Sequence, residues 1–326
     1  MPAVYACILA GGTGERFWPM SRERTPKQLL KLLSPRPMIA DAIRRLEPVV
    51  PPSRILVLTG RAQLDGVRAA LPSVPPEQII AEPARRDTGP AAALATALVR
   101  ARDPRGIVAL FPADAYIRDA GGFARQLAGA VELLAAAEEA MLLTFGIVPD
   151  HPATGFGYLQ IGEEIARAGG VVARRVARFV EKPDEATARG YVAAGGYAWN
   201  AGMFLWRADA FLAEAARQAP ALAAFIRDFP EGDPAAYIEE RFPRLPRISV
   251  DYAIMEKAAS VGVVLAEFDW DDVGAWSALP RHLPADEAGN TVSGPAALVD
   301  AANNIVVSNG RVIALCGVRD LVVVET

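Results

Sequence analysis

Apolar residues recur along the chain with two different periods. Short runs of Val, Ile, Leu and Ala, bounded by Gly, Pro or charged residues, are typical of buried strands. Between the early runs lie stretches whose apolar residues recur every three or four positions, as on one face of a helix. These patterns predict strands at 4–10, 54–60, 78–83, 106–114, 140–148, 174–183, 198–206 and 262–270, and helices at 38–46, 62–71, 90–102 and 123–137.

The order of these elements indicates an α/β fold. Strands that alternate with helices form βαβ units, which place parallel strands in one sheet with helices on its faces. Beyond about residue 155 the spacing becomes irregular, so we expect a Rossmann-like mixed, mainly parallel sheet flanked by helices. The segment 208–246 shows helical periods interrupted by prolines and is expected to cover one face of this sheet.

The last forty residues have a different pattern. From about residue 284, short runs of Val, Ile and Leu are separated by small turns and show no helical period. This pattern predicts a small all-β piece, such as a few turns of a β-helix. We therefore expect a large catalytic domain at residues 1–283 and a small β domain at residues 284–326. A β domain of this length is not stable alone. We therefore expect it to pack on the main domain or on a second subunit.

Composition narrows the classes of partner. The chain has 326 residues and a net charge of −4, which provides no broad basic surface for nucleic acid or an acidic membrane. The start, MPAVYACILA, lacks the basic residues and the length of a signal peptide or membrane span, so we expect a cytoplasmic protein. Cys7 and Cys316 lie far apart in apolar segments and are expected to be buried free thiols.

The loop after the first predicted strand carries the clearest chemical signal. In LAGGTGERFWPMSRERTPKQ, residues 9–28, Phe17 stands where the dinucleotide fingerprint needs a third glycine, and the lysine of a P-loop is missing. The glycines still let backbone N–H groups approach phosphate oxygens. Arg16 adds a fork of donors, and Lys27 is one of only four lysines in the chain. These residues favour nucleotide phosphate binding over a simple turn.

Carboxylates stand at the ends of two predicted strands. Asp114 ends FPAD, and Asp272 lies in FDWDDVGAW before a turn. Ligands of open α/β sheets bind at the carboxyl ends of strands, although a lone aspartate there also suits a helix cap. Two such carboxylates can hold Mg²⁺ together with substrate phosphates and water. His151 and His282 lie beside prolines or surface residues, so histidine acid–base chemistry is not expected.

Residues 9–28 resemble the signature of the sugar-nucleotide pyrophosphorylases, and the form FWPMSR…PKQ is similar to that of the mannose-1-phosphate guanylyltransferases among them. Further segments between Glu82 and Trp276 occur in the order typical of this family. The resemblance implies the nucleotidyltransferase fold and a Mg²⁺-assisted transfer of GMP from GTP to mannose 1-phosphate. It also implies that Asp114 and Asp272 hold the metal. We interpret the neighbouring Asp269 and Asp271 as solvated or capping residues.

The resemblance also assigns the nucleotide side. It implies that the EPARRDTGP loop meets guanine and ribose, where the Glu82 carboxylate can accept from guanine N1–H and N2–H₂. The helix that follows should be capped by Asp87 or Thr88; the family more often has asparagine and alanine where this chain has Asp87 and Gly89. The implied catalytic residues are Arg16 and Lys27, and the implied nucleotide-binding residues are Leu9, Ala10, Gly11, Gly12, Gly14, Glu82, Arg86 and Thr88.

On the sugar-phosphate side, the resemblance points to TGFGYLQ, FVEKP and WNAGMFLW. It implies contacts from Gly157, Glu181, Lys182 and Asn200, with Lys182 on the phosphate. Asp251, in SVDYAIMEK, either touches the substrate or caps the helix that follows, and the cap is the preferred interpretation.

Two alternatives to GMP transfer stay open at this point. One is transfer from dTTP or UTP to glucose 1-phosphate. The other is a non-catalytic regulatory relative that binds sugar nucleotides, although Arg16, Lys27, Asp114 and Asp272 are all present. A homodimer is the expected assembly.

Overall fold

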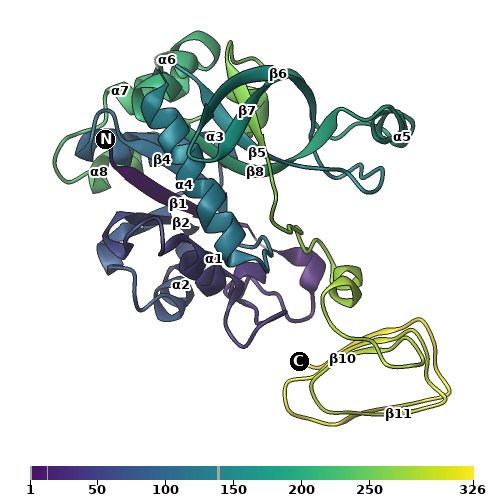
Figure 1. Cartoon of the computed structure of the whole chain (residues 1–326). Helices are drawn as coiled ribbons and strands as arrows, with labels where there is room; N and C mark the ends of the chain where they lie inside the picture. Colours follow the sequence, from purple (N-terminus) through teal and green to yellow (C-terminus); the bar gives the residue numbers. More distant parts are fainter. Residues whose placement is uncertain (1, 13, 138–139) are drawn as a thin grey trace.

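A computed structural model describes residues 2–12, 14–137 and 140–326 (Figure 1). Within these residues, the core is a nine-stranded sheet in the order β3–β2–β1–β4–β8–β5–β9–β7–β6. Neighbours among β1–β4 are parallel, as are β5 and β9, whereas β8, β7 and β6 pair antiparallel. The expected α/β fold with a mixed sheet is confirmed. The strands are β1 (Val4–Ala10), β2 (Ile55–Gly60), β3 (Ile79–Glu82), β4 (Ile107–Pro112), β5 (Leu142–Ile147), β6 (Tyr158–Ala168), β7 (Val171–Val180), β8 (Tyr197–Arg207) and β9 (Val261–Leu265).

Helices cover both faces of the sheet. In β1, Val4, Ala6 and Ile8 join one apolar cluster and Tyr5 and Cys7 join the other, because successive side chains of a strand point to opposite faces. Among the described helices, none is long and apolar enough to cross a membrane. The first face is covered by α1 (Met38–Leu46), α2 (Leu64–Ala70) and α4 (Ala120–Ala136), and the second by α3 (Thr88–Arg102), α6 (Ala208–Gln218), α7 (Pro220–Arg227) and α8 (Ala235–Arg241).

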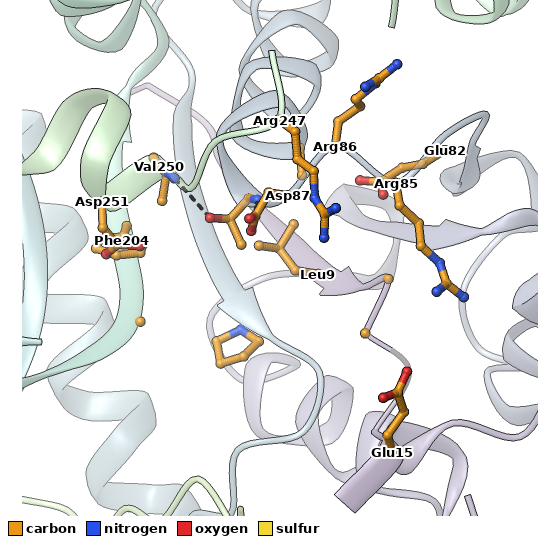
Figure 2. A pocket seen from close by; sticks show the side chains of 16 residues that line it. Leu9, Glu15, Glu82, Arg85, Arg86, Asp87, Phe204, Arg247, Val250 and Asp251 are labelled. Carbon is orange, nitrogen blue, oxygen red and sulfur yellow. Dashed lines mark hydrogen bonds between the residues drawn. The ribbon is translucent and has the colours of Figure 1, made fainter. Parts of the chain in front are cut away.

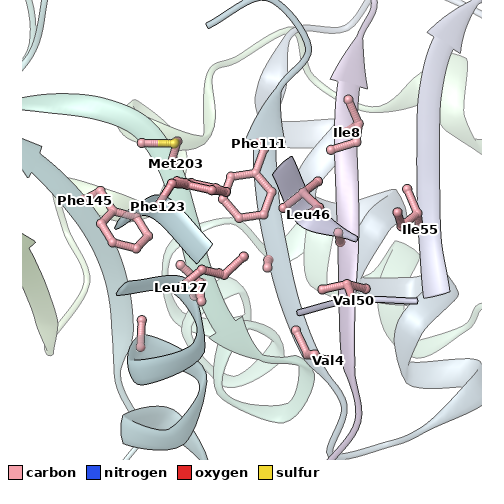
Figure 3. Packing of buried hydrophobic residues seen from close by; sticks show 14 of the residues in the cluster. Val4, Ile8, Leu46, Val50, Ile55, Phe111, Phe123, Leu127, Phe145 and Met203 are labelled. Atoms are coloured by element: carbon pink, nitrogen blue, oxygen red, sulfur yellow. The ribbon is translucent and has the colours of Figure 1, made fainter. Parts of the chain in front are cut away.

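Aromatic side chains fill the space between α4 and the sheet (Figure 3). The ring of Phe123, from α4, packs edge-on against Phe111 of β4 and against Phe268, with ring centroids 5.7 and 5.2 Å apart. On the other face, the alanine-rich α3 approaches the sheet closely. There the buried Trp206 indole donates to Thr96 Oγ1 at 3.0 Å, so its polar atom is satisfied inside the core.

One long strand escaped the sequence prediction. β6 pairs with β7 and β8 and ends in the two-glycine turn Gly169–Gly170, where both glycines have positive φ. Its sequence, YLQIGEEIARA, is largely half-buried or exposed beyond its first two residues, so it lacks the continuous apolar run of the inner strands. The helix α5 (Glu185–Ala194) follows the end of β7 and projects away from the sheet (Figure 1).

The chain ends in a coil of short parallel strands, drawn in yellow away from the main sheet (Figure 1). The parallel β-coil expected after residue 284 is confirmed, while the domain boundary itself stays a prediction. Asn304 Nδ2 donates to Asn290 Oδ1 at 2.8 Å between successive turns inside the coil. The coil pairs β10 (Thr291–Ser293), β12 (Ile305–Val307) and β14 (Val322–Val324) in one sheet, and β11 (Ala296–Val299) and β13 (Ile313–Cys316) in another.

The coil contacts the main domain through a third apolar cluster. Val307 of β12 is buried there with Phe17 and Leu279, so this end of the coil covers the loop after β1. The far side of the coil has no such cover. Cys316 is therefore exposed, and only Cys7 is the buried thiol that the sequence predicted for both.

A matched pair of glycines tests the packing of α4. A Cβ at Gly129 would lie 2.4 Å from the backbone oxygen of Gly169, in the turn between β6 and β7. We expect Gly129→Ala to lower the free energy of unfolding by about 1–3 kcal/mol, because the backbone must shift to admit the methyl group.

Gly190→Ala is the control, since a Cβ at Gly190 in α5 meets nothing within 4 Å. This variant should be slightly stabilised, by about 0.4–1 kcal/mol. Urea unfolding measures both changes. Equal stability of the two variants would contradict the close approach of α4 to the β6–β7 turn.

Candidate functional site

The site lies where the sheet changes its winding direction. From β1 the chain moves outward through β2 and β3, and then returns to place β4 on the other side of β1. Such a switch point opens a crevice at the carboxyl ends of the two central strands. Two cavities occupy it, of about 580 and about 300 Å³. Both are lined by Pro112, Gly202 and Asp251, so they adjoin at these residues.

The loop after β1 crosses itself at the mouth of this crevice. Gly14 has a φ of 63°, and a Cβ there would lie 2.4 Å from Lys27 Cβ, so only glycine lets the two arms of the loop meet. Gln28 Nε2 donates to the carbonyl of Ala10 at 2.6 Å and to that of Gly12 at 3.1 Å. The buried ring of Phe17 packs edge-on against Trp276 at 4.9 Å. These contacts hold the loop against the end of β1.

The ammonium group of Lys27 joins three distant segments. Its Nζ lies 2.8 Å from Asp114 Oδ2, and it donates to the carbonyl oxygens of Asp114 and Asp272 at 3.1 and 2.5 Å. Lys27 is only 4% exposed, so these oxygens replace its water. The structure thus brings together three residues that the sequence selected, from positions 87 and 245 residues away from Lys27.

Arg16 lies beside the second carboxylate. A Cβ at Gly274 would come within 2.9 Å of Asp272 Oδ2 and 3.1 Å of Arg16 Nη1, so the three residues pack closely and a side chain at 274 would displace these charged groups. Burial raises the pKa of Asp272, while the neighbouring Lys27 and Arg16 oppose this rise. Arg16, Lys27, Asp114 and Asp272 all line the smaller cavity.

Asp114 and Asp272 alone supply too few ligands for a magnesium ion, so a bound substrate would have to supply others. Within the described residues, no group of three or more His, Cys, Asp or Glu side chains could hold a metal. Asp114 and Asp272 nevertheless face one cavity, and Mg²⁺ commonly takes one or two carboxylates and completes its shell with phosphate oxygens and water. The donor set therefore suits a metal that arrives with a phosphate ligand.

The larger cavity gathers most of the predicted nucleotide residues. Thr88 begins α3, where the Asp87 carboxylate accepts from its N–H at 2.9 Å, so the predicted cap is confirmed. A Cβ at Gly89 would lie 2.6 Å from the carbonyl oxygen of Ile248, which explains why glycine stands there. The predicted residues that line this cavity are Leu9, Gly11, Gly12, Glu82, Arg86 and Thr88, and Figure 2 shows Leu9, Glu82 and Arg86 among its labelled side chains.

Two predicted nucleotide-binding residues, Ala10 and Gly14, do not line the larger cavity but support the loop beside it. Ala10 is buried, and its carbonyl is used by Gln28 and by Thr59 Oγ1, so it supports the loop. Gly14 permits the crossing of the loop. Arg85 and Arg247, which the sequence did not mark, line the cavity, and Figure 2 shows the guanidinium of Arg247 near Asp87. Arg85 adjoins the selected motif, whereas no local signal marked Arg247.

The sugar-phosphate residues meet at the smaller cavity. Gly157, Glu181 and Asn200 line it, and a Cβ at Gly157 would lie 2.5 Å from Glu181 Oε2, so glycine leaves room for that carboxylate. Lys182 differs from them, because it does not line the cavity. Its Nζ pairs with Glu181 Oε1 at 2.6 Å, its side chain is largely exposed, and this contact raises the pKa of the ammonium.

Asp251 lies at the wall of both cavities, and the preferred expectation that it caps a helix is wrong, because no side-chain cap bond is made there. Its Oδ1 accepts from Asn200 Nδ2 at 2.9 Å, and the residue lines both cavities. Burial, reinforced by the nearby Glu181 carboxylate, raises the pKa of Asp251 to about 6. Its place in SVDYAIMEK gave a signal, but a short helix after an aspartate also suggests a cap. Only the fold brings it against Asn200.

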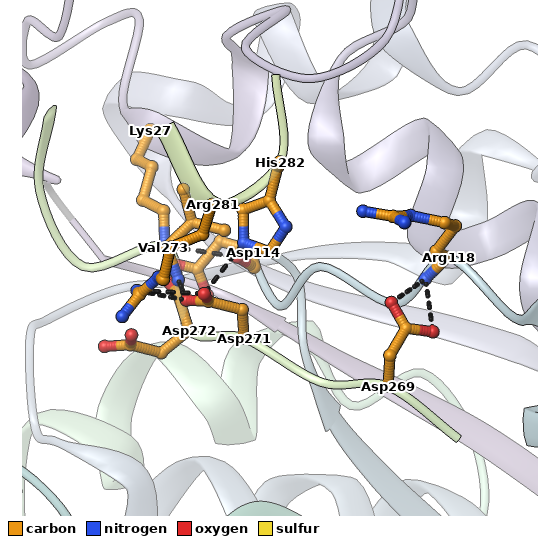
Figure 4. Close-up of polar contacts among 9 residues, drawn as sticks. All are labelled: Lys27, Asp114, Arg118, Asp269, Asp271, Asp272, Val273, Arg281 and His282. Atoms are coloured by element: carbon orange, nitrogen blue, oxygen red, sulfur yellow. Dashed lines mark hydrogen bonds and ion pairs between the residues drawn. The ribbon is translucent and has the colours of Figure 1, made fainter. Parts of the chain in front are cut away.

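The two other aspartates of the DWDD stretch differ from each other. Asp269 accepts from the backbone N–H groups of Arg118 and Asp119, as the capping prediction expected. The side chain of Asp271 is only 12% exposed and pairs with Arg281 and His282, so it is not solvated. Its Oδ1 accepts from the N–H of Val273 at 2.7 Å, which agrees with the alternative of a capping residue. Figure 4 shows both carboxylates with their partners.

Comparison with known proteins agrees with this geometry. A family model described as Nucleotidyl transferase matches residues 5–288. The chain belongs to the nucleotidyl transferase family. It is 39% identical over 333 residues to a protein of Klebsiella pneumoniae named mannose-1-phosphate guanylyltransferase, covering 98% of this chain and 68% of that protein. It is 38% identical to the xanthan biosynthesis protein XanB of Xanthomonas campestris, covering 100% of this chain and 69% of that protein.

A solved structure shares the fold of this nucleotidyl transferase along nearly its whole length. It is described as mannose-1-phosphate geranyltransferase from Thermus thermophilus, with a TM-score of 0.87 and 35% identity. The match covers 99% of this chain and 92% of that one, so it includes the C-terminal coil. The family that the sequence resembled is therefore confirmed, together with membership of the nucleotidyltransferase class of enzymes.

In this nucleotidyl transferase, the buried carboxyl group of Glu82 makes stability depend on pH. Burial raises its pKa to about 8 from an ordinary value of 4.5. Between these values the folded protein holds a proton that the unfolded chain releases, so raising the pH across this window destabilises the fold.

We expect Glu82→Gln to be neutral at pH 4.5 and to stabilise the ligand-free protein at pH 8.5, by at least about 1 kcal/mol. Chemical denaturation at the two pH values measures this difference. Glu77→Gln, an exposed change close by, is the control. If the stability gain of Glu82→Gln is the same at both pH values, the carboxyl group does not carry the raised pKa.

Proposed function

We propose that this chain transfers GMP from GTP to mannose 1-phosphate, giving GDP-mannose and pyrophosphate. The observation that carries the proposal is the meeting of two cavities, one lined by the Gly11–Gly12 turn and Glu82, the other by the cluster around Lys27. A nucleotide and a sugar phosphate could lie in them with their phosphates at the shared wall. The relatives named for mannose-1-phosphate guanylyltransferase support this choice of substrates.

The larger cavity would hold the nucleotide. Backbone N–H groups of Gly11 and Gly12 can approach phosphate oxygens without a side chain between them. The Glu82 carboxylate, when ionised, can accept from N1–H and N2–H₂ of guanine, a donor pair that adenine does not offer. Thr88 Oγ1 accepts from the N–H of Val250, and the Arg86 guanidinium donates to the carbonyl of Pro243. Both side chains are therefore held in place before a nucleotide binds.

The smaller cavity would hold the sugar phosphate. Asn200 is fixed between Thr144 Oγ1, which donates to its Oδ1 at 2.9 Å, and Asp251, which accepts from its Nδ2. Glu181 and Asn200 together offer acceptors and a donor for neighbouring hydroxyl groups. Lys182 would leave its ion pair with Glu181 to meet the phosphate, a motion open to an exposed and flexible side chain.

The reaction needs charge neutralisation more than proton transfer. A phosphate oxygen of mannose 1-phosphate attacks the α-phosphorus of GTP, the bond from that phosphorus to the bridging oxygen of the β-phosphate breaks, and pyrophosphate leaves with the electron pair. The attacking group is already an anion at neutral pH, since a phosphate monoester loses its second proton with a pKa of about 6. Arg16 and Lys27 would stabilise charge on the leaving group. Asp114 and Asp272 would hold Mg²⁺, which neutralises phosphate charge when bound.

Pyrophosphate release with crossed substrates tests the proposal. Four nucleoside triphosphates are combined with mannose, glucose and N-acetylglucosamine 1-phosphates in the presence of Mg²⁺. Release with GTP and mannose 1-phosphate alone supports the proposal. Release with dTTP or UTP and glucose 1-phosphate would replace the substrates and keep the mechanism. Nucleotide binding without any release would favour a regulatory protein.

Two substitutions test the assigned roles. Lys27→Ala and Asp114→Ala should each lower kcat by about 10²–10³, because each removes a group that acts on phosphate charge in the transition state. Lys257→Ala, at an exposed lysine outside both cavities, should leave the rate unchanged. Circular dichroism checks that the variants fold. A near-normal rate in a folded Lys27 or Asp114 variant would contradict the role of that residue.

We also propose that the enzyme acts in the cytoplasm as a homodimer. Exposed apolar side chains of the coil support a second copy, because Val299, Val312 and Val322 are each at least half exposed. Burying apolar side chains of this kind stabilises association. Light scattering should give twice the mass of one chain, and Val312→Asp with Val322→Asp should shift the protein toward monomer. A monomer in the unmodified protein would contradict this assembly.

A further inference from the structure

A backbone bridge connects the two loops that carry the metal-site carboxylates. The N–H of Tyr116 donates to the carbonyl of Asp271 at 2.8 Å, and the N–H of Asp271 donates back to Tyr116 at 3.0 Å. Tyr116 stands two residues after Asp114, and Asp271 immediately precedes Asp272. The distance between the two carboxylates therefore depends on this bridge and on the turn that follows it.

The side chain of Asp271 holds that turn. Its Oδ1 accepts from the N–H of Val273 at 2.7 Å, and its Oδ2 lies 2.7 Å from His282 Nε2 and 2.8 Å from Arg281 Nη2 (Figure 4). Both carboxylate oxygens thus have partners in the segment that follows Asp272. None of these partners belongs to the residues assigned to substrate binding.

The turn needs such support because its backbone is strained. Val273 has a φ of 44°, a left-handed conformation that branched side chains rarely adopt. Residues persist in this region only where surrounding contacts overdetermine them. For Val273 these contacts are its fully buried side chain and the Asp271 carboxylate. Relaxing the turn would rotate the neighbouring peptide and displace the carboxylate of Asp272.

The His282 side chain also supports the turn at Val273. Its side chain is 11% exposed, and its ring lies 4.6 Å from the ring of Tyr116 between ring centroids. It therefore contacts both halves of the backbone bridge, the Asp271 carboxylate and the Tyr116 side chain. His282 has exposed Arg281 beside it, as the sequence indicated, but its own side chain is largely covered. The buried ring comes from the segment that leads into the C-terminal coil.

We propose that Asp271 and His282 are a positioning pair that holds the Asp272 carboxylate at the spacing from Asp114 that a divalent cation requires. Neither residue touches the substrate or the metal. The pair acts through the strained turn at Val273 and the bridge to Tyr116. This inference rests on the metal role assigned to Asp114 and Asp272 in the proposed function.

Metal binding without turnover tests the pair. Mn²⁺ is titrated into the full chain with GTP and no sugar phosphate, and free Mn²⁺ is followed by electron paramagnetic resonance. Asp271→Ala and His282→Ala should weaken Mn²⁺ binding about 10–100-fold, as is usual when groups that orient metal ligands are removed. His282→Gln keeps a side-chain N–H donor and should recover most of the affinity.

Asp269→Ala is the matched control. Its carboxylate lies two residues before Asp271 but binds only the backbone of the Arg118 loop, so Mn²⁺ binding should stay unchanged. If Asp271→Ala does not fold, Asp271→Asn takes its place, since its amide oxygen can still accept from Val273 N–H while the charge facing His282 is lost. That variant should bind Mn²⁺ more weakly than the unmodified protein.

Thermal unfolding of the same variants separates positioning from stability. Variants that unfold at lower temperature yet bind Mn²⁺ like the unmodified protein would show a purely structural role and overturn the proposal. So would a His282→Gln variant that is no better than His282→Ala. Failure of the proposed function is distinguishable, because it would appear as absent GDP-mannose formation in the unmodified enzyme. The Mn²⁺ titration needs no turnover and can use whichever nucleotide that enzyme binds.

Discussion

The buried ammonium group of Lys27 is the contact on which the site depends. Burying an ammonium group without partners would be strongly unfavourable, and the three oxygens around Nζ take the place of the water that the group has lost. Those oxygens belong to Asp114, which follows β4, and to Asp272, in the segment after β9. The loop after β1, the end of β4 and the DWDD turn must therefore close on one point, and the crevice takes its shape from that closure.

Close backbone approach is the second constraint. Gly14 admits Lys27, Gly274 lies against Arg16 and Asp272, and Gly157 leaves space for Glu181. At each of these positions a Cβ would meet another residue of the site at under 3.0 Å. The glycines thus set how near the charged groups come to one another. They also leave backbone N–H groups accessible in the Gly11–Gly12 turn, where phosphate oxygens are proposed to bind.

Charge is divided between the two sides of the crevice. Burial raises the pKa of Asp251, and the Glu181 carboxylate lies close enough to oppose the ionisation of Asp251 further. Arg16, Lys27 and Lys182 provide the opposing positive charge near the proposed phosphates. This arrangement suits two anionic substrates that must approach each other, because fixed cations lower their mutual repulsion without reorganising during the reaction.

The sequence by itself determined the elements whose signals are local. The strand at 4–10 and the helix at 38–46 have the predicted bounds, because an apolar run and a helical period are complete within a few residues. Arg16, Lys27, Asp114 and Asp272 were likewise selected from short motifs. Tertiary structure alone decided the rest. Asp251 meets Asn200 across 51 residues, and β6 owes its place to its pairing with β7 and β8. The His282 side chain is largely covered only because the chain returns to Tyr116. Such contacts join distant segments, so no local pattern of residues encodes them.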